Sequence, residues 1–372
     1  MRRPCNSVPS PLAGEGQGEG YRWAGLIASV AICTLLATSA FADAQEGEVK
    51  AMTEACANAT GGNDQIAACT KLIDTRLLKE KALAQALYQR GLAFAELGQY
   101  QNAVRDFDQA LKFAPEATDA KFNRGAALSK LGKWDQALED FDALLKQVPN
   151  DPNTLYARAW VQSQRGQDAA AIADLDQVLE QAPDDRDALI DRGGLNIRAG
   201  RYDAAIKDFA ALLKLEPQSA AAAYNRGRAH YAKGDYQPAA ADFGLALKLR
   251  TDNPYAALRR YLAEGRIAGK LSNQDAALKA AAEKLEPEVW PRPLLELFLG
   301  TGTPEALLAG INQVPAKQRP PVLCEANYYL GERALIAGDK DAARAYFQAA
   351  ADTNAITQLE YIDAKGALRE TD

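Results

Sequence analysis

The chain contains few residues of the types that catalyse reactions or bind metals. It is 372 residues long and has one histidine, His230, which excludes every metal or catalytic site that needs two imidazoles. No nucleophile in a recognisable context accompanies His230, so we interpret it as a packed or hydrogen-bonded side chain. The glycine-rich stretches GEGQGEG and GRIAGKL lack the context or the spacing of phosphate-binding loops. We therefore expect no enzyme activity, no cofactor and no metal.

Arginine and aspartate each recur at 34-residue steps, and two interpretations follow. The arginines could form a stripe that binds anions, or they could pair with the aspartates as a structural ladder between helices of one unit or of adjacent units. We favour the ladder because opposite charges that recur with the same period neutralise each other. Its members are Arg90, Arg124, Arg158, Arg192 and Arg226, with Asp106, Asp140, Asp174, Asp208 and Asp242.

Two cysteines are placed for a disulfide. Cys56 and Cys69 stand thirteen residues apart on either side of the turn-forming sequence GGND at 61–64, and an oxidising compartment would let them close a helical hairpin. The alternative is a pair of small buried thiols. Cys324 has no evident partner.

An uncharged stretch at residues 23–42 indicates where the protein resides. It follows Arg22 and ends in Ala-Phe-Ala before an acidic segment, as is typical of a secretory signal cleaved after Ala42. We therefore expect an exported, periplasmic protein. An inner-membrane anchor is the alternative, because the stretch is about long enough to span a bilayer. An outer-membrane lipoprotein is disfavoured, because the bulky Ile32 directly precedes Cys33.

The composition is that of a folded, acidic chain. Hydrophobic residues make up 48% and charged residues 25%, which excludes a disordered polymer and a multi-span membrane protein. The net charge is −6, and no run of Lys or Arg forms a basic face. We therefore expect no nucleic acid among the partners.

A 34-residue period dominates the middle of the sequence. Five glycines lie at this spacing without one insertion, and a second glycine or alanine series, an alanine series and an aromatic or leucine series share the period. The first of these series consists of Gly98, Gly132, Gly166, Gly200 and Gly234. Such agreement predicts stacked units of one supersecondary structure, because a single unit cannot bury its own apolar face.

This pattern, from residue 84 to 253, resembles the tetratricopeptide repeat (TPR). Gly91 and Ala103 match the small residues that let two antiparallel helices approach, Gly98 the turn between them, and Pro115 the end of the second helix. The resemblance implies an all-α fold, a right-handed TPR superhelix (an α-solenoid) of antiparallel helix pairs.

The repeats divide the chain into six segments. The expected organisation is a leader and signal peptide (1–42), an N-terminal degenerate helical pair (43–83), five regular TPR units (84–253), a degenerate repeat (254–285), a helical Pro-rich insert (286–322), and a final TPR unit with a capping helix from about 357 to 369 (323–372).

In proteins that resemble this one, the first helix of each unit faces a concave groove. At the position three residues before the packing glycine or alanine, this chain has four aromatic side chains and one isoleucine, Ile190, and Trp160 lies one turn after Tyr156. An aromatic stripe of this kind can hold a peptide with little loss of entropy. The alternative is that these residues pack against the next repeat. The groove candidates are Tyr88, Phe122, Tyr156, Trp160 and Tyr224.

The last third of the chain resembles NlpI-type bacterial envelope lipoproteins over residues 286–368, through the order LLELFLG, a short insert, and EANYYLGERALIAGDKDAARAYFQAAA. The resemblance implies a non-enzymatic envelope scaffold or adaptor. Its partners would be other proteins, among them envelope hydrolases or proteases linked to peptidoglycan turnover, and a homodimer. The alternatives are a membrane-anchored or purely structural TPR protein, and a cell-wall hydrolase with an unrecognised site.

Overall fold

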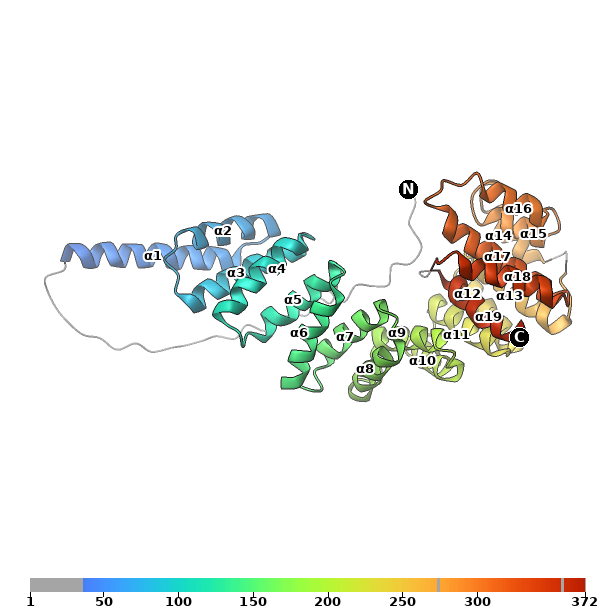
Figure 1. Ribbon diagram of the computed structural model, residues 1–372, viewed down its shortest axis with the longest axis horizontal. Coiled ribbons are helices and arrows are strands. Elements are labelled where there is room, and N and C mark those ends of the chain that lie inside the picture. Colours follow the sequence, from blue (N-terminus) through green and yellow to red (C-terminus); the bar gives the residue numbers. More distant parts are fainter. Residues whose placement is uncertain (1–35, 273–274, 356–357, 372) are drawn as a thin grey trace. The chain divides into compact units, whose positions relative to one another are not determined.

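A computed structural model describes residues 36–272, 275–355 and 358–371, with side chains between residues 46 and 368. Most of the expected leader, residues 1–35, lies outside this range. The described residues form nineteen helices and no strand (Figure 1), which confirms the predicted all-α class. Within the same residues, no helix combines the length and the apolar content that crossing a membrane requires.

The chain divides into two compact units between Arg165 and Gly166. Unit 1 contains α1 (Leu36–Asn58), α2 (Gly62–Asp74), α3 (Glu80–Glu96), α4 (Tyr100–Phe113), α5 (Thr118–Lys130), α6 (Trp134–Gln147) and α7 (Pro152–Gln164). Unit 2 begins with α8 (Asp168–Gln181), α9 (Arg186–Arg198), α10 (Tyr202–Leu215), α11 (Ala220–Lys233), α12 (Tyr236–Leu249) and α13 (Pro254–Ala268). It continues with α14 (Ala276–Glu283), α15 (Arg292–Phe298), α16 (Pro304–Ile311), α17 (Arg319–Ile336), α18 (Lys340–Asp352) and α19 (Leu359–Thr371).

A glycine and an aromatic ring pack together in four of the five regular repeats, and the third repeat has Ala159 and Leu175 at these positions. Phe107 on α4 is fully buried, and its ring atom Cε1 would lie 2.6 Å from a Cβ placed on Gly91 of α3. Only a residue without a side chain leaves room for the ring, so the small and large residues of the repeat are complementary in shape. Gly98, at φ +70°, makes the turn between the same two helices in a left-handed conformation that other residues rarely adopt.

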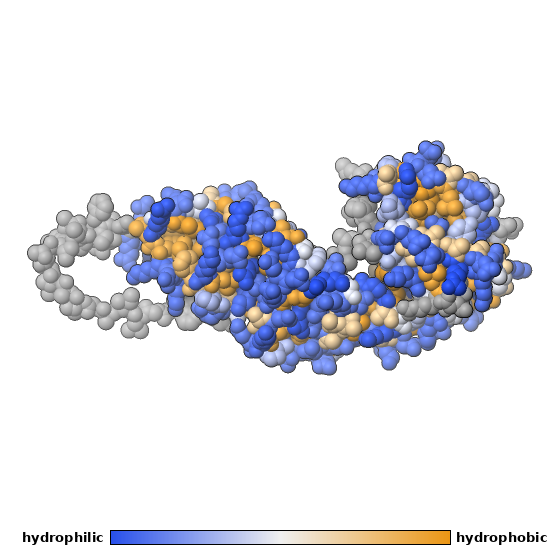
Figure 2. Space-filling view, in the orientation of Figure 1, coloured by the Kyte–Doolittle hydropathy of each residue, from blue (hydrophilic) through white to orange (hydrophobic). Residues whose placement is uncertain are grey.

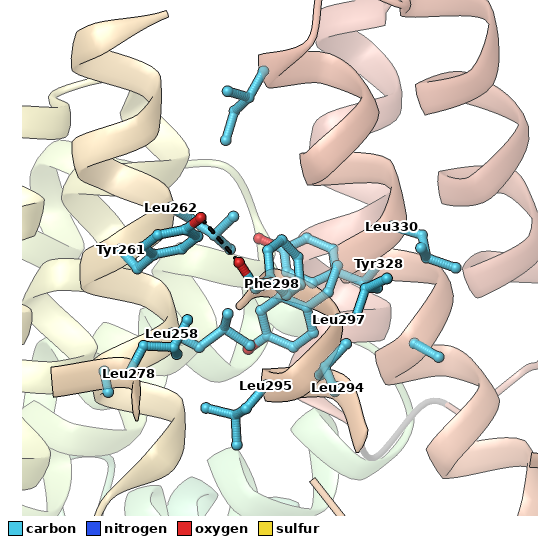
Figure 3. Close-up of a cluster of buried hydrophobic side chains, with 14 of the residues drawn as sticks. Leu258, Tyr261, Leu262, Leu278, Leu294, Leu295, Leu297, Phe298, Tyr328 and Leu330 are labelled. Carbon is cyan, nitrogen blue, oxygen red and sulfur yellow. Dashed lines mark hydrogen bonds between the residues drawn. The ribbon is translucent and has the colours of Figure 1, made fainter. Parts of the chain in front are cut away.

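The Pro-rich insert is part of the core of unit 2. Leu294, Leu295, Leu297 and Phe298 on α15 are buried against leucines of α13 and α14 and against Tyr328 of α17 (Figure 3). The Tyr261 hydroxyl donates a hydrogen bond of 3.2 Å to the carbonyl oxygen of Phe298. This apolar packing fixes α15 beside the final repeat.

The last helices begin at positions that differ slightly from those expected. α17 starts at Arg319, inside the segment assigned to the insert, because Pro320 and Pro321 occupy its first turn, where no backbone N–H is needed. The capping helix α19 spans Leu359–Thr371, two residues later than predicted.

Candidate functional site

The arginine ladder joins the two helices of a repeat by paired hydrogen bonds. Nε and Nη2 of Arg90 donate to the two carboxylate oxygens of Asp106 at 2.7 and 2.8 Å, and Arg124 binds Asp140 in the same way. The further pairs within one repeat are Arg192 with Asp208 and Arg226 with Asp242. The pair of Arg158 with Asp174 stays a prediction, because Arg158 belongs to unit 1 and Asp174 to unit 2.

A second set of aspartates completes the ladder, and sequence reasoning missed it. The guanidinium of Arg124 also binds Asp108, on the second helix of the preceding repeat, at 2.7 Å. Arg158 and Arg192 bind Asp142 and Asp176 at the same distance. These aspartates also recur every 34 residues, which was the available signal. The arginines are therefore occupied by protein carboxylates and do not form an anion-binding stripe.

In unit 1, the predicted groove residues lie half-buried on the first helices of their repeats. The ring of Tyr88 packs 5.9 Å from that of Phe107, and the ring of Phe122 packs 5.8 Å from that of Phe141. The Tyr88 hydroxyl accepts a hydrogen bond of 3.2 Å from the amide of Asn123, and burial raises its pKa to about 12. Each aromatic residue is thus anchored at its base by the core of its own repeat.

Two tryptophans meet at one end of this series. The Trp134 and Trp160 rings lie 5.7 Å apart, edge to face, and both are half-buried. The Lys130 ammonium lies 5.3 Å from the centre of the Trp160 ring, and burial lowers the pKa of this lysine. Tyr156, one turn before Trp160 on α7, is also half-buried. We call Tyr88, Phe122, Tyr156 and Trp160 the aromatic face of unit 1.

In unit 2, charged side chains of α13 and α19 lie near the corresponding residue, Tyr224. Tyr224 packs 5.5 Å from Phe243, and the guanidinium of Arg259 lies 5.9 Å from its ring. Burial raises the pKa of Tyr224 to about 12, and the carboxylates of Glu360 and Asp363 on α19 lie close enough to influence it. Tyr224 is half-buried, as the aromatic residues of unit 1 are, and its place in a groove stays a prediction.

Two buried arginines bind carboxylates of α19. Arg228 binds Asp363 at 2.8 Å, and Arg259 binds Asp363 at 2.7 Å and Glu360 at 3.0 Å. All four side chains are at most 7% exposed. Although burial opposes ionisation, the two guanidinium groups hold the pKa of Asp363 below its usual value. These ion pairs fasten α19 to α11 and α13.

A separate carboxylate in unit 2 has no such cation in contact. Glu325 on α17 accepts hydrogen bonds from the Trp290 indole nitrogen at 2.5 Å and from the Tyr255 hydroxyl at 2.9 Å. Burial, reinforced by the nearby charge of Glu360, raises its pKa to about 7. Glu325 thus connects the segment before α15 to α13 and α17.

The cysteines are placed as the sequence suggested. Cys56 and Cys69 form a disulfide that joins α1 to α2. Cys324 is a free buried thiol, and burial raises its pKa to about 11. A thiol of this kind is a poor nucleophile at neutral pH.

His230 lies in the last turn of α11. Its Nδ1 lies 3.6 Å from a carboxylate oxygen of Asp235, at the turn that ends α11. In the part of the chain that the structure describes, no three His, Cys, Asp or Glu side chains are grouped to hold a metal ion.

Figure 2 shows mostly polar residues on the visible surface, with apolar patches between them.

The comparisons with known proteins agree with this fold. One family model of the tetratricopeptide repeat matches residues 88–152 and 195–257, and another matches residues 128–190. The chain is similar to YrrB, described as a TPR protein with an unusual peptide-binding site, at 23% identity over 51% of this chain and 95% of that one, with a TM-score of 0.45. A tetratricopeptide repeat protein from Parabacteroides merdae is 18% identical over 77% of this chain and 98% of its own, with a TM-score of 0.48. MamA from Desulfovibrio magneticus is 23% identical over 46% and 96%, with a TM-score of 0.42.

Proposed function

We propose that this chain, whose residues 88–190 and 195–257 are tetratricopeptide repeats, is a non-enzymatic scaffold that binds partner proteins through the aromatic face of unit 1. The observation that carries the proposal is the half-buried tryptophan pair, Trp134 and Trp160, beside the row of groove aromatics. Large aromatic side chains are the residues that most often dominate the binding energy of protein interfaces.

The packing of the aromatic face supports a role in binding. Phe107 and Phe141 hold the rings of Tyr88 and Phe122 from below, so that these side chains lose little conformational freedom when a ligand arrives. The partly exposed edges then offer apolar contact, together with the amide of Asn123 for polar contact. In unit 2, the guanidinium of Arg259, which binds two carboxylates of α19, lies beside the corresponding residue, Tyr224. We therefore place the binding site in unit 1.

The test is a pull-down from a bacterial envelope extract with the double variant Tyr156→Ala, Trp160→Ala. We expect it to lose a partner that the wild type retains, because removal of a buried aromatic anchor costs about 2 kcal/mol or more, or roughly thirtyfold in affinity. Helical content and melting temperature should change little. The matched control is Phe113→Ala, which removes an exposed aromatic ring at the end of α4, outside the aromatic face. Unchanged binding by the double variant would contradict the proposal.

We further propose that the protein acts in the periplasm, as an adaptor for envelope hydrolases or proteases, and that it forms a homodimer through its C-terminal region. The support is the resemblance of residues 286–368 to NlpI-type proteins and the disulfide between Cys56 and Cys69, which suits an oxidising compartment. Mass spectrometry of the captured proteins and sedimentation of the purified chain test these two points. Wall-degrading activity of the purified protein would contradict the non-enzymatic assignment.

A further inference from the structure

The packing of α19 in unit 2 shows how a helix rests on these repeats. The carboxylate of Asp363 binds Arg228 on α11 at 2.8 Å. One turn later, a Cβ placed on Gly366 would lie 3.3 Å from the Tyr202 hydroxyl, at the start of α10. The Tyr202 hydroxyl therefore lies beside the glycine of α19, and Arg228 binds the side chain three residues before that glycine.

The same two positions exist two repeats earlier, in unit 1. A shift of 68 residues carries Tyr202 onto Trp134 and Arg228 onto Trp160. Trp134 is the first residue of α6, as Tyr202 is of α10, and Trp160 is the ninth residue of α7, as Arg228 is of α11. The helix pairs are equivalent, so the tryptophans stand where unit 2 holds a helix.

Among residues 36–165, no helix takes the part that α19 plays in unit 2. Helices α1–α7 follow one another as the alternating members of repeat pairs, and within this unit α6 and α7 pack against each other and against α5. The side chains of Trp134 and Trp160 are half-buried. A helix is therefore the kind of ligand that fits this place.

We propose that Trp134 and Trp160 bind a helix of a partner protein in the pose that α19 adopts in unit 2. This inference rests on the proposed function and specifies its ligand. Unit 1 has Trp160 at the position where unit 2 has Arg228. The partner helix should therefore carry an aliphatic side chain where α19 carries a carboxylate, and a glycine or alanine three residues later, against Trp134.

The test uses α19 itself as the probe. Two peptides of residues 359–371 are prepared, one with the natural sequence and one with Asp363→Leu, each held helical by a cross-link on its exposed face, since helices this short are marginal alone. Their binding to the full-length protein is measured by fluorescence anisotropy. We expect the Asp363→Leu peptide to bind at least about tenfold more tightly than the natural peptide, because only the leucine suits Trp160.

The variant Trp160→Arg provides the decisive comparison. It gives unit 1 the residue that unit 2 uses, so the preference between the two peptides should reverse in favour of the natural sequence. A purely structural role of Trp160 would weaken both peptides alike and leave no reversal. Circular dichroism checks that the variant is folded. Binding of neither peptide, or equal binding of both by the wild type and the variant, would overturn the inference.

The outcomes separate this inference from the proposed function. If Tyr156→Ala, Trp160→Ala loses a cellular partner while neither peptide binds the wild type, the aromatic face binds proteins but not a helix in the pose of α19. If the partner is retained and neither peptide binds, both proposals fail.

Discussion

At the scale of single residues, each bridging arginine of the ladder serves two carboxylates with different surroundings. Arg124 binds Asp140, whose side chain is 6% exposed, and Asp108, whose side chain is 48% exposed. The buried partner lies within the same repeat and the exposed partner in the preceding repeat. The energy of the two contacts should therefore differ, because water screens only the second.

We predict that Asp140→Ala lowers the free energy of unfolding by about 2 to 3 kcal/mol, because it removes the buried half of a bidentate pair. The matched variant Asp108→Ala removes the exposed partner of the same arginine and should cost less than about 1 kcal/mol. Urea denaturation followed by circular dichroism measures both values. Equal losses would show that burial does not set the strength of the ladder.

Glu325 should make the stability of the protein depend on pH. The pKa of Glu325 is about 7 in the folded chain, against an ordinary value of 4.5, because burial and Glu360 disfavour its charge more than Tyr255, Trp290 and Arg259 favour it. Its favourable contribution is complete below pH 4.5 and is lost as the pH rises to about 7, to a total of up to about 3 kcal/mol.

In Glu325→Gln, the side chain stays neutral at every pH, so this loss should disappear. Urea denaturation at pH 5 and pH 8 compares the variant with the wild type. We expect the variant to gain stability relative to the wild type at pH 8. A difference between the two proteins that is the same at both pH values would contradict the raised pKa.

At the scale of helices, contact between a glycine and a phenylalanine sets how closely the two helices pack in four of the five regular repeats. On α9, two adjacent glycines differ in this respect. A Cβ on Gly193 would lie 2.7 Å from the Phe209 ring, whereas a Cβ on Gly194 would have no atom within 4 Å. Only the first glycine is required by packing.

We predict that Gly193→Ala destabilises the protein by about 1 to 3 kcal/mol, because the methyl group must displace a ring in a filled core. Gly194→Ala, on the same helix, should be neutral or stabilise by up to about 1 kcal/mol through helix propensity. Thermal unfolding of the two variants is the measurement. Equal melting temperatures for both would show that the ring of Phe209 yields freely.

At the scale of the whole molecule, the stability of the N-terminal hairpin should depend on whether the protein resides in an oxidising compartment. The disulfide of Cys56 and Cys69 closes the helical pair α1 and α2, which among the described residues packs against the repeat that begins with α3. Closing a loop of this length stabilises by roughly 3 kcal/mol. We therefore expect the hairpin to be stably folded only in a compartment where disulfides form.

We predict that the protein recovered from a bacterial periplasm begins at Asp43 and carries this disulfide. Intact-mass measurement and non-reducing peptide mapping give both results from one sample. In the Cys56→Ser, Cys69→Ser variant, hydrogen exchange should become faster in α1 and α2 and stay unchanged in α17. An uncleaved N-terminus with two free thiols would contradict the proposed export.

The sequence by itself determined the helical class, the 34-residue unit and the residues that repeat within it. Gly91, Phe107, Arg90 and Asp106 recur at fixed spacing, and their contacts join helices that are adjacent in the chain. A contact across sixteen residues that recurs in several repeats leaves a periodic signal, so it can be found without coordinates.

Only the tertiary structure decided which side chains lie beside each predicted groove residue. Arg228 meets Asp363 across 135 residues, and Arg259 meets Glu360 across 101. These contacts occur once, follow no period, and depend on where α19 lies after the insert has joined the core. Spacing along the chain predicted Tyr224 and Trp160 as members of one aromatic stripe. Packing places Arg259, which is bound to α19, beside Tyr224 and places Trp134 beside Trp160, because the neighbours of each residue depend on distant segments that local spacing does not encode.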